Sequence, residues 1–367
     1  MSTIIHIITT LERGGAEKHL LDLSAAQTRS HKQVKVIPLK GLNTLEHEFI
    51  KNGIEVLNFL LNRPFVVQIF LLYKYKRSSF VILHAHLPRA EILAAICRRK
   101  NILIVTRHNA ENFLPNFIRL SSLLSRLVVK RAKRVIAISI AVKNFLIRNE
   151  EISNKSLIDV VYYGKDLSRT INIYTRKEVQ TFKEEINLRK EVILIGTISR
   201  LEEQKDLPTL LKAFKSIHVS HPNTHLLLAG DGKLLEKLKT LANILEISSS
   251  VHFIGKIQEI DLFLQSIDCF VLSSKYEGFG LVLLEAMQNN VPIVATNISA
   301  IPEVMGNKYP FLANVGNFNS FASKIENILF AESNFNFKKY YDKRLNYFSL
   351  SKEVEILDKI YNQNSNA

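Results

Sequence analysis

The sequence predicts an α/β protein made of two doubly wound, Rossmann-like domains. Its 367 residues exceed the roughly 100–200 residues of a typical single domain. Short β-branched runs alternate with amphipathic segments along most of the chain, which indicates parallel strands joined by crossover helices. The alternation pauses once, in a polar and charged segment between about residues 164 and 190. These observations predict two sheets with a connection between them.

Five apolar runs in the first half are typical of buried strands: 4–10, 34–39, 80–86, 102–109 and 134–139. Amphipathic segments follow four of them and predict helices at 16–27, 45–53, 89–99 and 141–149. The second half repeats the pattern, with strands expected at 192–199, 224–232, 251–255, 269–274 and 292–296. Its helices are expected at 206–217, 233–245, 260–267 and 280–290.

These elements give domain boundaries of 1–170 and 171–347, followed by an amphipathic C-terminal helix over 348–367 that we expect to pack back on the first domain. Ligands of doubly wound sheets bind beyond the carboxyl ends of the strands. We therefore expect the two domains to face a cleft that holds the ligand site.

The composition argues against a secreted, disulfide-bonded protein and against a membrane-spanning one. The two cysteines, Cys97 and Cys269, suggest neither a disulfide framework nor a cysteine metal site, and the N-terminus lacks the features of a signal peptide, so a cytoplasmic protein is expected. No apolar stretch reaches the length of a membrane span. The net charge of +15 is concentrated in residues 1–170, which hold 27 Lys and Arg against 12 Asp and Glu, while 171–367 hold 22 of each.

The strongest local signal is the segment from Ser273 to Pro302, a strand, the loop KYEGFG, a helix and another strand. Gly278 and Gly280 allow the backbone to approach a ligand, and the helix beginning near Leu281 directs its N–H groups and positive dipole end there, which suits a phosphate. Glu285 is suited to a ribose diol and Glu277 to sugar hydroxyls. The alternative is that Glu285 is only an acidic residue near the start of a helix, where such residues are common, and contacts no ligand.

A second signal precedes the helix at 206–217. Arg200 and Lys205 lie five residues apart on one loop, where they are suited to holding a diphosphate and stabilising negative charge on it. The alternative is that both are solvated surface residues.

The eight-residue spacing of Glu277 and Glu285, an E-x7-E pattern within EGFGLVLLE followed by PIVA, closely resembles retaining glycosyltransferases of the GT-B fold, the large group 1 type that includes family 4. The resemblance covers most of the chain and is strongest from about 192 to 304. It implies a donor-binding C-terminal domain, where Arg200 and Lys205 match the phosphate-binding pair. Asn290, Ser299, Ala300 and Tyr163 depart from the family pattern, replacing three common glycines and an asparagine.

The resemblance implies further contacts. The loop with Gly14 and Gly15 faces the donor phosphates in the family, although most Gly-Gly pairs are only tight turns, and Gly230 matches a strand-end turn at the donor site. Backbone or side-chain contacts to the donor are also expected from Phe279 and Leu281. A histidine at the place of His108 lies near the transferred sugar. His86 and Arg107 are weaker candidates for acceptor binding.

No metal or other cofactor is expected. The chain has no Asp-x-Asp, no phosphate loop of the G-x-x-x-x-G-K-[ST] type and no H-E-x-x-H. A metal site at His84 and His86 lacks an evident third ligand. His108, Glu277, Arg200 and Lys205 are the catalytic candidates.

The predicted activity is transfer of a sugar, with retention, from a UDP-linked donor to a saccharide or lipid-linked acceptor in bacterial surface polysaccharide or lipopolysaccharide assembly. Residues 113–135, within the basic half, contain a stretch that alternates apolar and basic residues and is suited to an anionic membrane face. The alternative there is a core helix with a solvated rim. Rival functions are a nucleotide-sugar epimerase or hydrolase on the same fold, and a basic nucleic-acid-binding protein, although the chain carries no recognition motif for nucleic acid.

Overall fold

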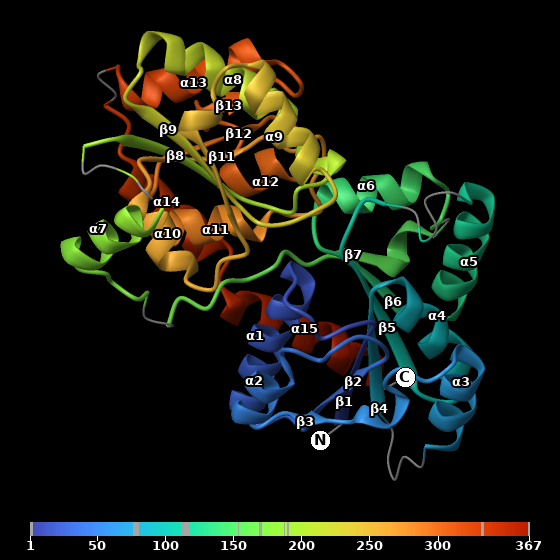
Figure 1. Ribbon diagram of the computed structural model, residues 1–367. Helices are drawn as coiled ribbons and strands as arrows, with labels where there is room; N and C mark the ends of the chain where they lie inside the picture. Colours follow the sequence, from blue (N-terminus) through green and yellow to red (C-terminus); the bar gives the residue numbers. More distant parts are fainter. Residues whose placement is uncertain are drawn as a thin grey trace. The chain divides into compact units, whose positions relative to one another are not determined.

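The computed structural model describes residues 3–75, 81–111, 113, 117–152, 154–168, 171–186, 188, 191–331 and 334–365. The chain forms two compact units, Met1–Asp166 with Phe348–Ala367, and Leu167–Tyr347 (Figure 1). Each unit contains a parallel sheet with helices on both faces, as the strand–helix alternation predicts. None of the described helices is long and apolar enough to cross a bilayer.

The N-terminal unit is built on a sheet with the strand order β3-β2-β1-β4-β5-β6-β7. Its strands are β1 (Thr3–Ile8), β2 (Val34–Pro38), β3 (Glu55–Val56), β4 (Val81–His86), β5 (Ile102–Arg107), β6 (Arg134–Ala137) and β7 (Ile158–Val160). Its helices are α1 (Gly15–Arg29), α2 (Glu46–Lys51), α3 (Phe65–Lys74), α4 (Pro88–Cys97), α5 (Ile118–Arg131), α6 (Ile140–Arg148) and α15 (Leu350–Ser365), with short turns η1 (Asn58–Leu60) and η2 (Lys155–Leu157).

The C-terminal unit has the strand order β10-β9-β8-β11-β12-β13. Its strands are β8 (Ile193–Ile198), β9 (Thr224–Ala229), β10 (Val251–Gly255), β11 (Cys269–Leu272), β12 (Ile293–Thr296) and β13 (Leu312–Ala313). Its helices are α7 (Arg176–Glu185), α8 (Leu207–Ser220), α9 (Leu235–Ile244), α10 (Ile260–Ser266), α11 (Leu281–Gln288), α12 (Ile301–Met305), α13 (Phe318–Leu329) and α14 (Phe337–Tyr347), with turns η3 (Glu203–Lys205) and η4 (Ser248–Ser250).

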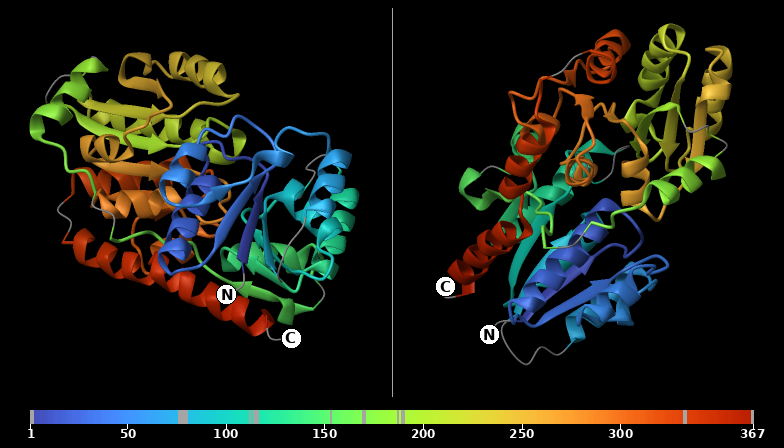
Figure 2. Two further views of the ribbon diagram at one scale, coloured as in Figure 1. Left: turned by 90° about the horizontal axis from the view of Figure 1, so that it is seen from below. Right: turned by 90° about the vertical axis from the view of Figure 1, so that its left-hand side faces the viewer.

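Helix α15 is the last element of the chain and belongs to the N-terminal unit. Its apolar residues join one core cluster with residues of α1 and of strands β1, β4, β5 and β6: Leu350, Val354, Leu357, Ile360 and Tyr361. Figure 2 shows α15 in red along this unit, beside α1. The sheet face under α1 and α15 is therefore closed by a helix from the far end of the sequence.

Several segments differ from the sequence-based expectation. The polar connection around 164–190 contains a helix, α7, which begins with a capping box made by Thr175 and Glu178. Within the stretch 113–135, helix α5 ends at Arg131, and β6 begins at Arg134.

Candidate functional site

In the C-terminal unit, the strand order reverses between β8 and β11, and the loops that follow these two strands meet at this switch point. Hydrogen bonds tie the loops together. Ser273 Oγ donates to the Lys205 carbonyl oxygen (2.7 Å), the Lys275 N–H donates to the Gln204 carbonyl (2.8 Å), and Gln204 Nε2 donates to the Tyr276 carbonyl (3.0 Å). The two loops that carry the strongest sequence motifs therefore form one structure.

Lys205 and Glu277 form an ion pair at the centre of this structure. Their Nζ and Oε1 atoms lie 2.5 Å apart, and the side chains are only 14% and 8% exposed. Ser274 Oγ donates to the same Oε1 atom (2.6 Å), and Ser299 Oγ donates to the Glu277 carbonyl (2.9 Å). The carboxylate is thus fixed in position by its neighbours.

Arg200 lies on the same loop but at the surface, with 61% of its side chain exposed. Its guanidinium contacts Glu202 Oε2 (2.8 Å) and Gln204 Oε1 (3.1 Å). The loop therefore offers one partly buried cation, Lys205, and one accessible planar cation, Arg200, which together suit a polyanionic ligand.

Helix α11 begins directly after the Glu277 loop, as predicted. Its N-cap is Gly280, with a φ of +90°, and no side chain caps the helix. A glycine is favoured in this left-handed conformation. Leu281 and Glu285 lie in the first and second turns and are partly buried, whereas Gly278 is buried and the Phe279 ring packs in the interior. The uncapped N–H groups and the helix dipole favour an anion at this place.

Gly230 follows β9 and packs against the Arg200 loop. It has a φ of +140°, and a Cβ atom there would lie 1.9 Å from the Ser199 carbonyl oxygen. Its N–H donates to the Gly255 carbonyl (2.7 Å), while the Leu201 N–H donates to the Asp231 carbonyl (2.9 Å). The glycine is thus required for the close approach of two strand-end loops, whatever else it contacts.

In the N-terminal unit, Gly14 is the N-cap of α1 and Gly15 is its first residue. A Cβ atom on Gly14 would lie 2.3 Å from Glu17 Oε2, whose carboxylate also accepts from Thr10 Oγ1 (2.6 Å). The pair lies at the carboxyl end of β1, next to the switch point between β1 and β4.

Arg107, a weak acceptor candidate, is 3% exposed. Its guanidinium lies between two buried carboxylates, 2.8 Å from Glu91 Oε2 and 3.2 Å from Glu151 Oε2, and it donates to Ser125 Oγ (2.7 Å). Burial raises the pKa of Glu91 to about 7 despite the nearby Arg107. This geometry favours a structural role for Arg107.

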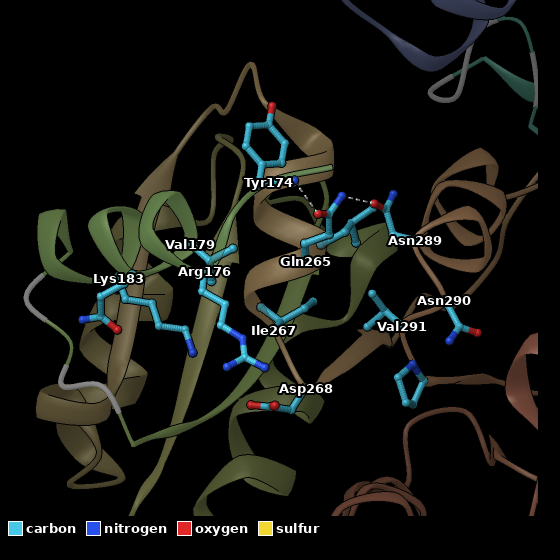
Figure 3. Close-up of a pocket in the computed structure, with 13 residues that line it drawn as sticks. Tyr174, Arg176, Val179, Lys183, Gln265, Ile267, Asp268, Asn289, Asn290 and Val291 are labelled. Atoms are coloured by element: carbon cyan, nitrogen blue, oxygen red, sulfur yellow. Dashed lines mark hydrogen bonds between the residues drawn. The ribbon is translucent and has the colours of Figure 1, made fainter. Parts of the chain in front are cut away.

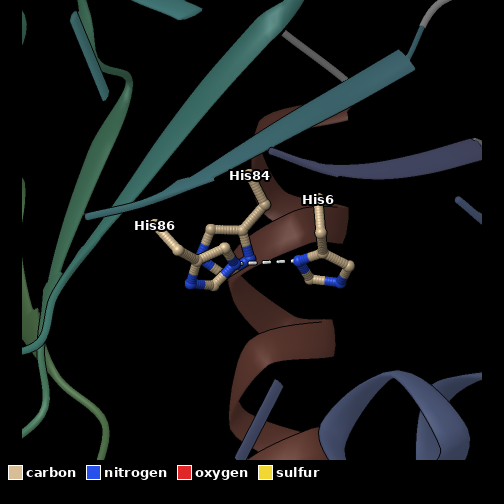
Figure 4. Close-up of side chains that lie close together, drawn as sticks. All are labelled: His6, His84 and His86. Atoms are coloured by element: carbon tan, nitrogen blue, oxygen red, sulfur yellow. Dashed lines mark hydrogen bonds between the residues drawn. The ribbon is translucent and has the colours of Figure 1, made fainter. Parts of the chain in front are cut away.

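The histidine candidates belong to a larger buried cluster. His6 on β1 is the register partner of His84 on β4, and His86 is the register partner of Thr106 on β5. Residues that are in register or two apart on a strand point to the same face, which is the face covered by α1 and α15. Figure 4 shows His6, His84 and His86 side by side, and a nitrogen from each lies within 4.8 Å of the others.

The prediction that His84 and His86 lack a third ligand is wrong, because His6 supplies a third imidazole. Each nitrogen of His6 and of His86, however, already has a hydrogen-bond partner. His6 Nε2 lies 2.8 Å from Gln27 Oε1, His6 Nδ1 lies 2.9 Å from His86 Nε2, and His86 Nδ1 lies 3.1 Å from His108 Nε2. A metal ion would have to replace these bonds.

His108 ends this series. Its Nδ1 atom is hydrogen-bonded to the hydroxyl of Tyr163, the residue that replaces the family's asparagine. Burial lowers the pKa of His108 to about 3 and the pKa of His6 to about 4, and it lowers the pKa of His84 and His86 well below 6.5. The four rings are therefore neutral at physiological pH.

The C-terminal helix contributes polar groups to the same cluster. Glu353 on α15 accepts from the Gly164 N–H (2.6 Å) and pairs with His19 Nε2 (2.9 Å), while the Tyr361 hydroxyl is bonded to His84 Nδ1 (2.8 Å) and accepts from Gln27 Nε2 (3.3 Å). Sequence reasoning missed these partners, since they lie hundreds of residues apart and carry no motif.

A separate pocket of about 580 Å³ lies in the C-terminal unit among α7, α10 and the residues before β11 and β12. Figure 3 shows its lining, which includes Arg176, Lys183 and Asp268. Asp268 and Val291 precede strands, so the pocket lies at the amino edge of the sheet, opposite the edge where ligands of such sheets bind. We do not assign it to the predicted site.

Family comparisons agree with this geometry. Residues 178–344 match the family model "Glycosyl transferases group 1", and residues 13–169 match "Glycosyltransferase Family 4". The structure is similar to the crystal structure of Anabaena HepE in complex with UDP and glucose, with a TM-score of 0.83 and 18% identity over 99% of this chain and 100% of that one.

Two relatives illustrate the sequence similarity. An uncharacterized glycosyltransferase of Methanocaldococcus jannaschii is 32% identical over 41% of this chain, which spans only 39% of that relative's length. The UDP-Gal:α-D-GlcNAc-diphosphoundecaprenol α-1,3-galactosyltransferase of Escherichia coli is 25% identical, over 79% of this chain and 77% of the relative. Since each unit matches one of the two family models, the chain belongs to the group 1 and family 4 glycosyltransferases, and its similarity to HepE shows the GT-B fold.

Proposed function

We propose that the protein transfers a sugar from a UDP-linked donor to a saccharide or lipid-linked acceptor, with retention of configuration, in the assembly of bacterial surface polysaccharide or lipopolysaccharide. One observation carries the proposal. The partly buried Lys205–Glu277 pair joins the two loops of the β8/β11 switch point, and the loop that carries Glu277 leads into the start of α11, which no side chain caps. Cation, carboxylate and helix N-terminus are the groups that a nucleotide diphosphate sugar needs.

Each group has a proposed role. Arg200, Lys205 and the N-terminus of α11 stabilise the negative charge that develops on the leaving diphosphate. Glu277, accepting from Ser274, orients the sugar hydroxyls, and Glu285 binds the ribose. His108 lies near the reacting centre. Fixed cations and N–H dipoles at the phosphates make a metal ion unnecessary in this proposal.

The choice of donor and acceptor rests on relatives. HepE was crystallised with UDP and glucose, and the E. coli enzyme is named for a UDP-linked donor and a diphosphoundecaprenol acceptor. Retention follows from the resemblance of the E-x7-E loop to retaining enzymes. We place the reaction on the cytoplasmic side of the membrane, which fits the two buried cysteines, Cys97 and Cys269, neither of which forms a disulfide.

A membrane-facing surface is proposed on the N-terminal unit. Helix α5 exposes two of its leucines and buries two of its serines. Leu123 and Leu127 are 55% and 52% exposed, whereas Ser121 and Ser125 are buried. Exposed basic residues flank the two leucines, and α3, which like α5 packs against α4, exposes Phe70. Of the stretch first suggested, 113–135, residues 114–116 lie outside the described part. Apolar side chains among basic ones favour an anionic bilayer surface.

The donor assignment is tested by thermal shift with UDP-, GDP- and ADP-sugars, followed by transfer assays on the donor that binds. A ligand that binds the native state at 100 times its Kd raises stability by about 2.7 kcal/mol. We expect a UDP-sugar to bind, and both Lys205→Ala and Glu277→Ala to abolish transfer. Normal transfer in both variants would sink the assignment, and product release without acceptor would identify a hydrolase instead.

The membrane assignment is tested by sedimentation with anionic vesicles and with neutral vesicles. The variant Leu123→Asp/Leu127→Asp should lose binding to the anionic vesicles. Ile244→Asp, at a residue 72% exposed on α9, is the matched control and should bind normally. Equal binding by all three proteins, or no binding by the wild type at low salt, would refute this surface.

A further inference from the structure

The buried histidines form a hydrogen-bonded chain with a defined direction. It runs from Gln27 on α1 through His6, His86 and His108 to Tyr163, and every link joins two residues that are at least 93% buried. A neutral imidazole has one donor and one acceptor nitrogen. The direction of the first link therefore determines all the others.

Gln27 sets the first link. Its Nε2 donates to the Tyr361 hydroxyl, which leaves Oε1 as the atom that faces His6, and an amide oxygen can only accept. His6 therefore carries its proton on Nε2 and accepts at Nδ1 from His86 Nε2. His86 in turn accepts at Nδ1 from His108 Nε2.

The last link follows in the same way. His108 uses its proton to bond His86, so its Nδ1 atom is an acceptor, and Tyr163 donates to it. Burial and the nearby Glu353 raise the pKa of Tyr163 well above 10, so its hydroxyl keeps the proton that this bond needs. Donors and acceptors match at every link, and all three imidazoles are neutral.

We propose that Gln27 is a positioning residue for His108: acting through His6 and His86, it keeps the proton of His108 on Nε2 and leaves Nδ1 as a hydrogen-bond acceptor. The inference rests on the proposed function, in which His108 lies near the reacting centre. His108 then receives a hydroxyl of the ligand and does not act as a general acid.

The place of that ligand hydroxyl is also defined. The free space beside His86, His108 and Tyr163 is about 10 Å³, enough for one water molecule and not for a sugar. A hydroxyl of the ligand reaches His108 Nδ1 only where the Tyr163 hydroxyl now lies. Tyr163 therefore stands in for the ligand hydroxyl and must move when it arrives.

The first test needs no substrate. In protein labelled with ¹⁵N-histidine, with signals assigned through His108→Asn and His6→Asn, we expect protonated Nε2 and unprotonated Nδ1 in His6, His86 and His108. A proton on Nδ1 of His108 would overturn the proposal. So would a bound metal ion present at one equivalent in the wild type and lost in His6→Asn, because coordination would break the chain.

The second test links the chain to turnover. Gln27→Met removes the acceptor of His6 at similar volume, which lets the chain invert, and we expect His108 to populate Nδ1–H and kcat to fall roughly tenfold with KM for the donor little changed. Gln68→Met is the matched control. Gln68 is equally buried in the same unit, but it bonds the Leu39 and Leu60 carbonyls. The control should lose comparable stability and keep the wild-type kcat and tautomers.

The outcomes separate the two proposals. An unchanged His108 spectrum in Gln27→Met, or a control that loses kcat equally, would refute the role of Gln27. If no nucleotide sugar is turned over by the wild type, the proposed function fails, and the ¹⁵N spectra still decide whether the chain has the stated direction.

Discussion

Replacing Lys205 by Met separates what the buried ion pair does for stability from what it does for transfer. The substitution leaves the Glu277 carboxylate, 8% exposed, with Ser274 as its remaining side-chain donor. Removing one partner of a fully buried pair costs about 3–5 kcal/mol, and the residual exposure of both groups places this case near the lower end, about 3 kcal/mol. For a unit of this size that is a fall in Tm of about 6–12 °C.

Adding Glu277→Gln to Lys205→Met removes the unpaired charge. We expect the double variant to regain most of the lost stability, since a neutral pair of similar volume is about as stable as a buried ion pair. Transfer should not return, because loss of one charge-stabilising donor lowers kcat about 10²–10³-fold.

Calorimetry and a transfer assay at saturating donor measure the two effects on the same proteins. Lys239→Met is the control, since Lys239 pairs with Glu236 on the surface of α9 and should cost less than about 0.5 kcal/mol. The reasoning is refuted if transfer recovers together with stability in the double variant, because the pair would then be structural only. An unchanged Tm in Lys205→Met would equally refute it.

Two further predictions concern the loops and the histidines. Gly230→Ala should destabilise the C-terminal unit by about 3 kcal/mol and abolish donor binding. Gly255 also has a positive φ but has open space around it, so Gly255→Ala should cost only about 1 kcal/mol. Equal losses of stability in denaturant titrations of the two variants would contradict the steric argument. The N-terminal unit should unfold in mild acid. A His whose pKa is lowered on folding stabilises the folded state above pH 6.5, and this stabilisation is lost as the pH falls toward the pKa in the folded state. For His6, whose pKa is about 4, the loss is roughly 3 kcal/mol. Hydrogen exchange between pH 7 and pH 4 should show this unit losing protection before the C-terminal unit, and simultaneous loss would count against the buried neutral imidazoles.

The central strands of both sheets could be predicted because each is a buried run rich in β-branched residues, a local pattern that indicates a strand without knowledge of its neighbours. The short edge strands β3, β7 and β13 could not. Each has two or three residues, such as Glu55–Val56, and is a strand only because β2, β6 or β12 offers a free parallel edge. Helix α14 was also missed, because its polar sequence carries no clear apolar stripe and Tyr341 packs in an aromatic cluster with Tyr309 and Phe337.

The candidate site, too, contains parts that the sequence predicts and parts that it does not. The loop with Glu277 was recognisable because its chemistry lies within one short segment. Its pairing with Lys205 joins residues 72 apart and depends on the switch point. His6 was overlooked because its relation to His84 is a strand register, which the sequence does not display. Asn290 and Ser299 replace family glycines, and φ values of +54° and +55° show why glycine is common there.

Helix α15 has a consequence for synthesis of the protein. The N-terminal unit needs Leu357, Ile360 and Tyr361 to complete its core, so a ribosome must translate the whole C-terminal unit before the first one can close. The C-terminal unit is continuous in sequence and can therefore fold first, reversing the usual order of co-translational folding. Until α15 is translated, the part of the histidine-bearing sheet face that this helix covers stays open to solvent.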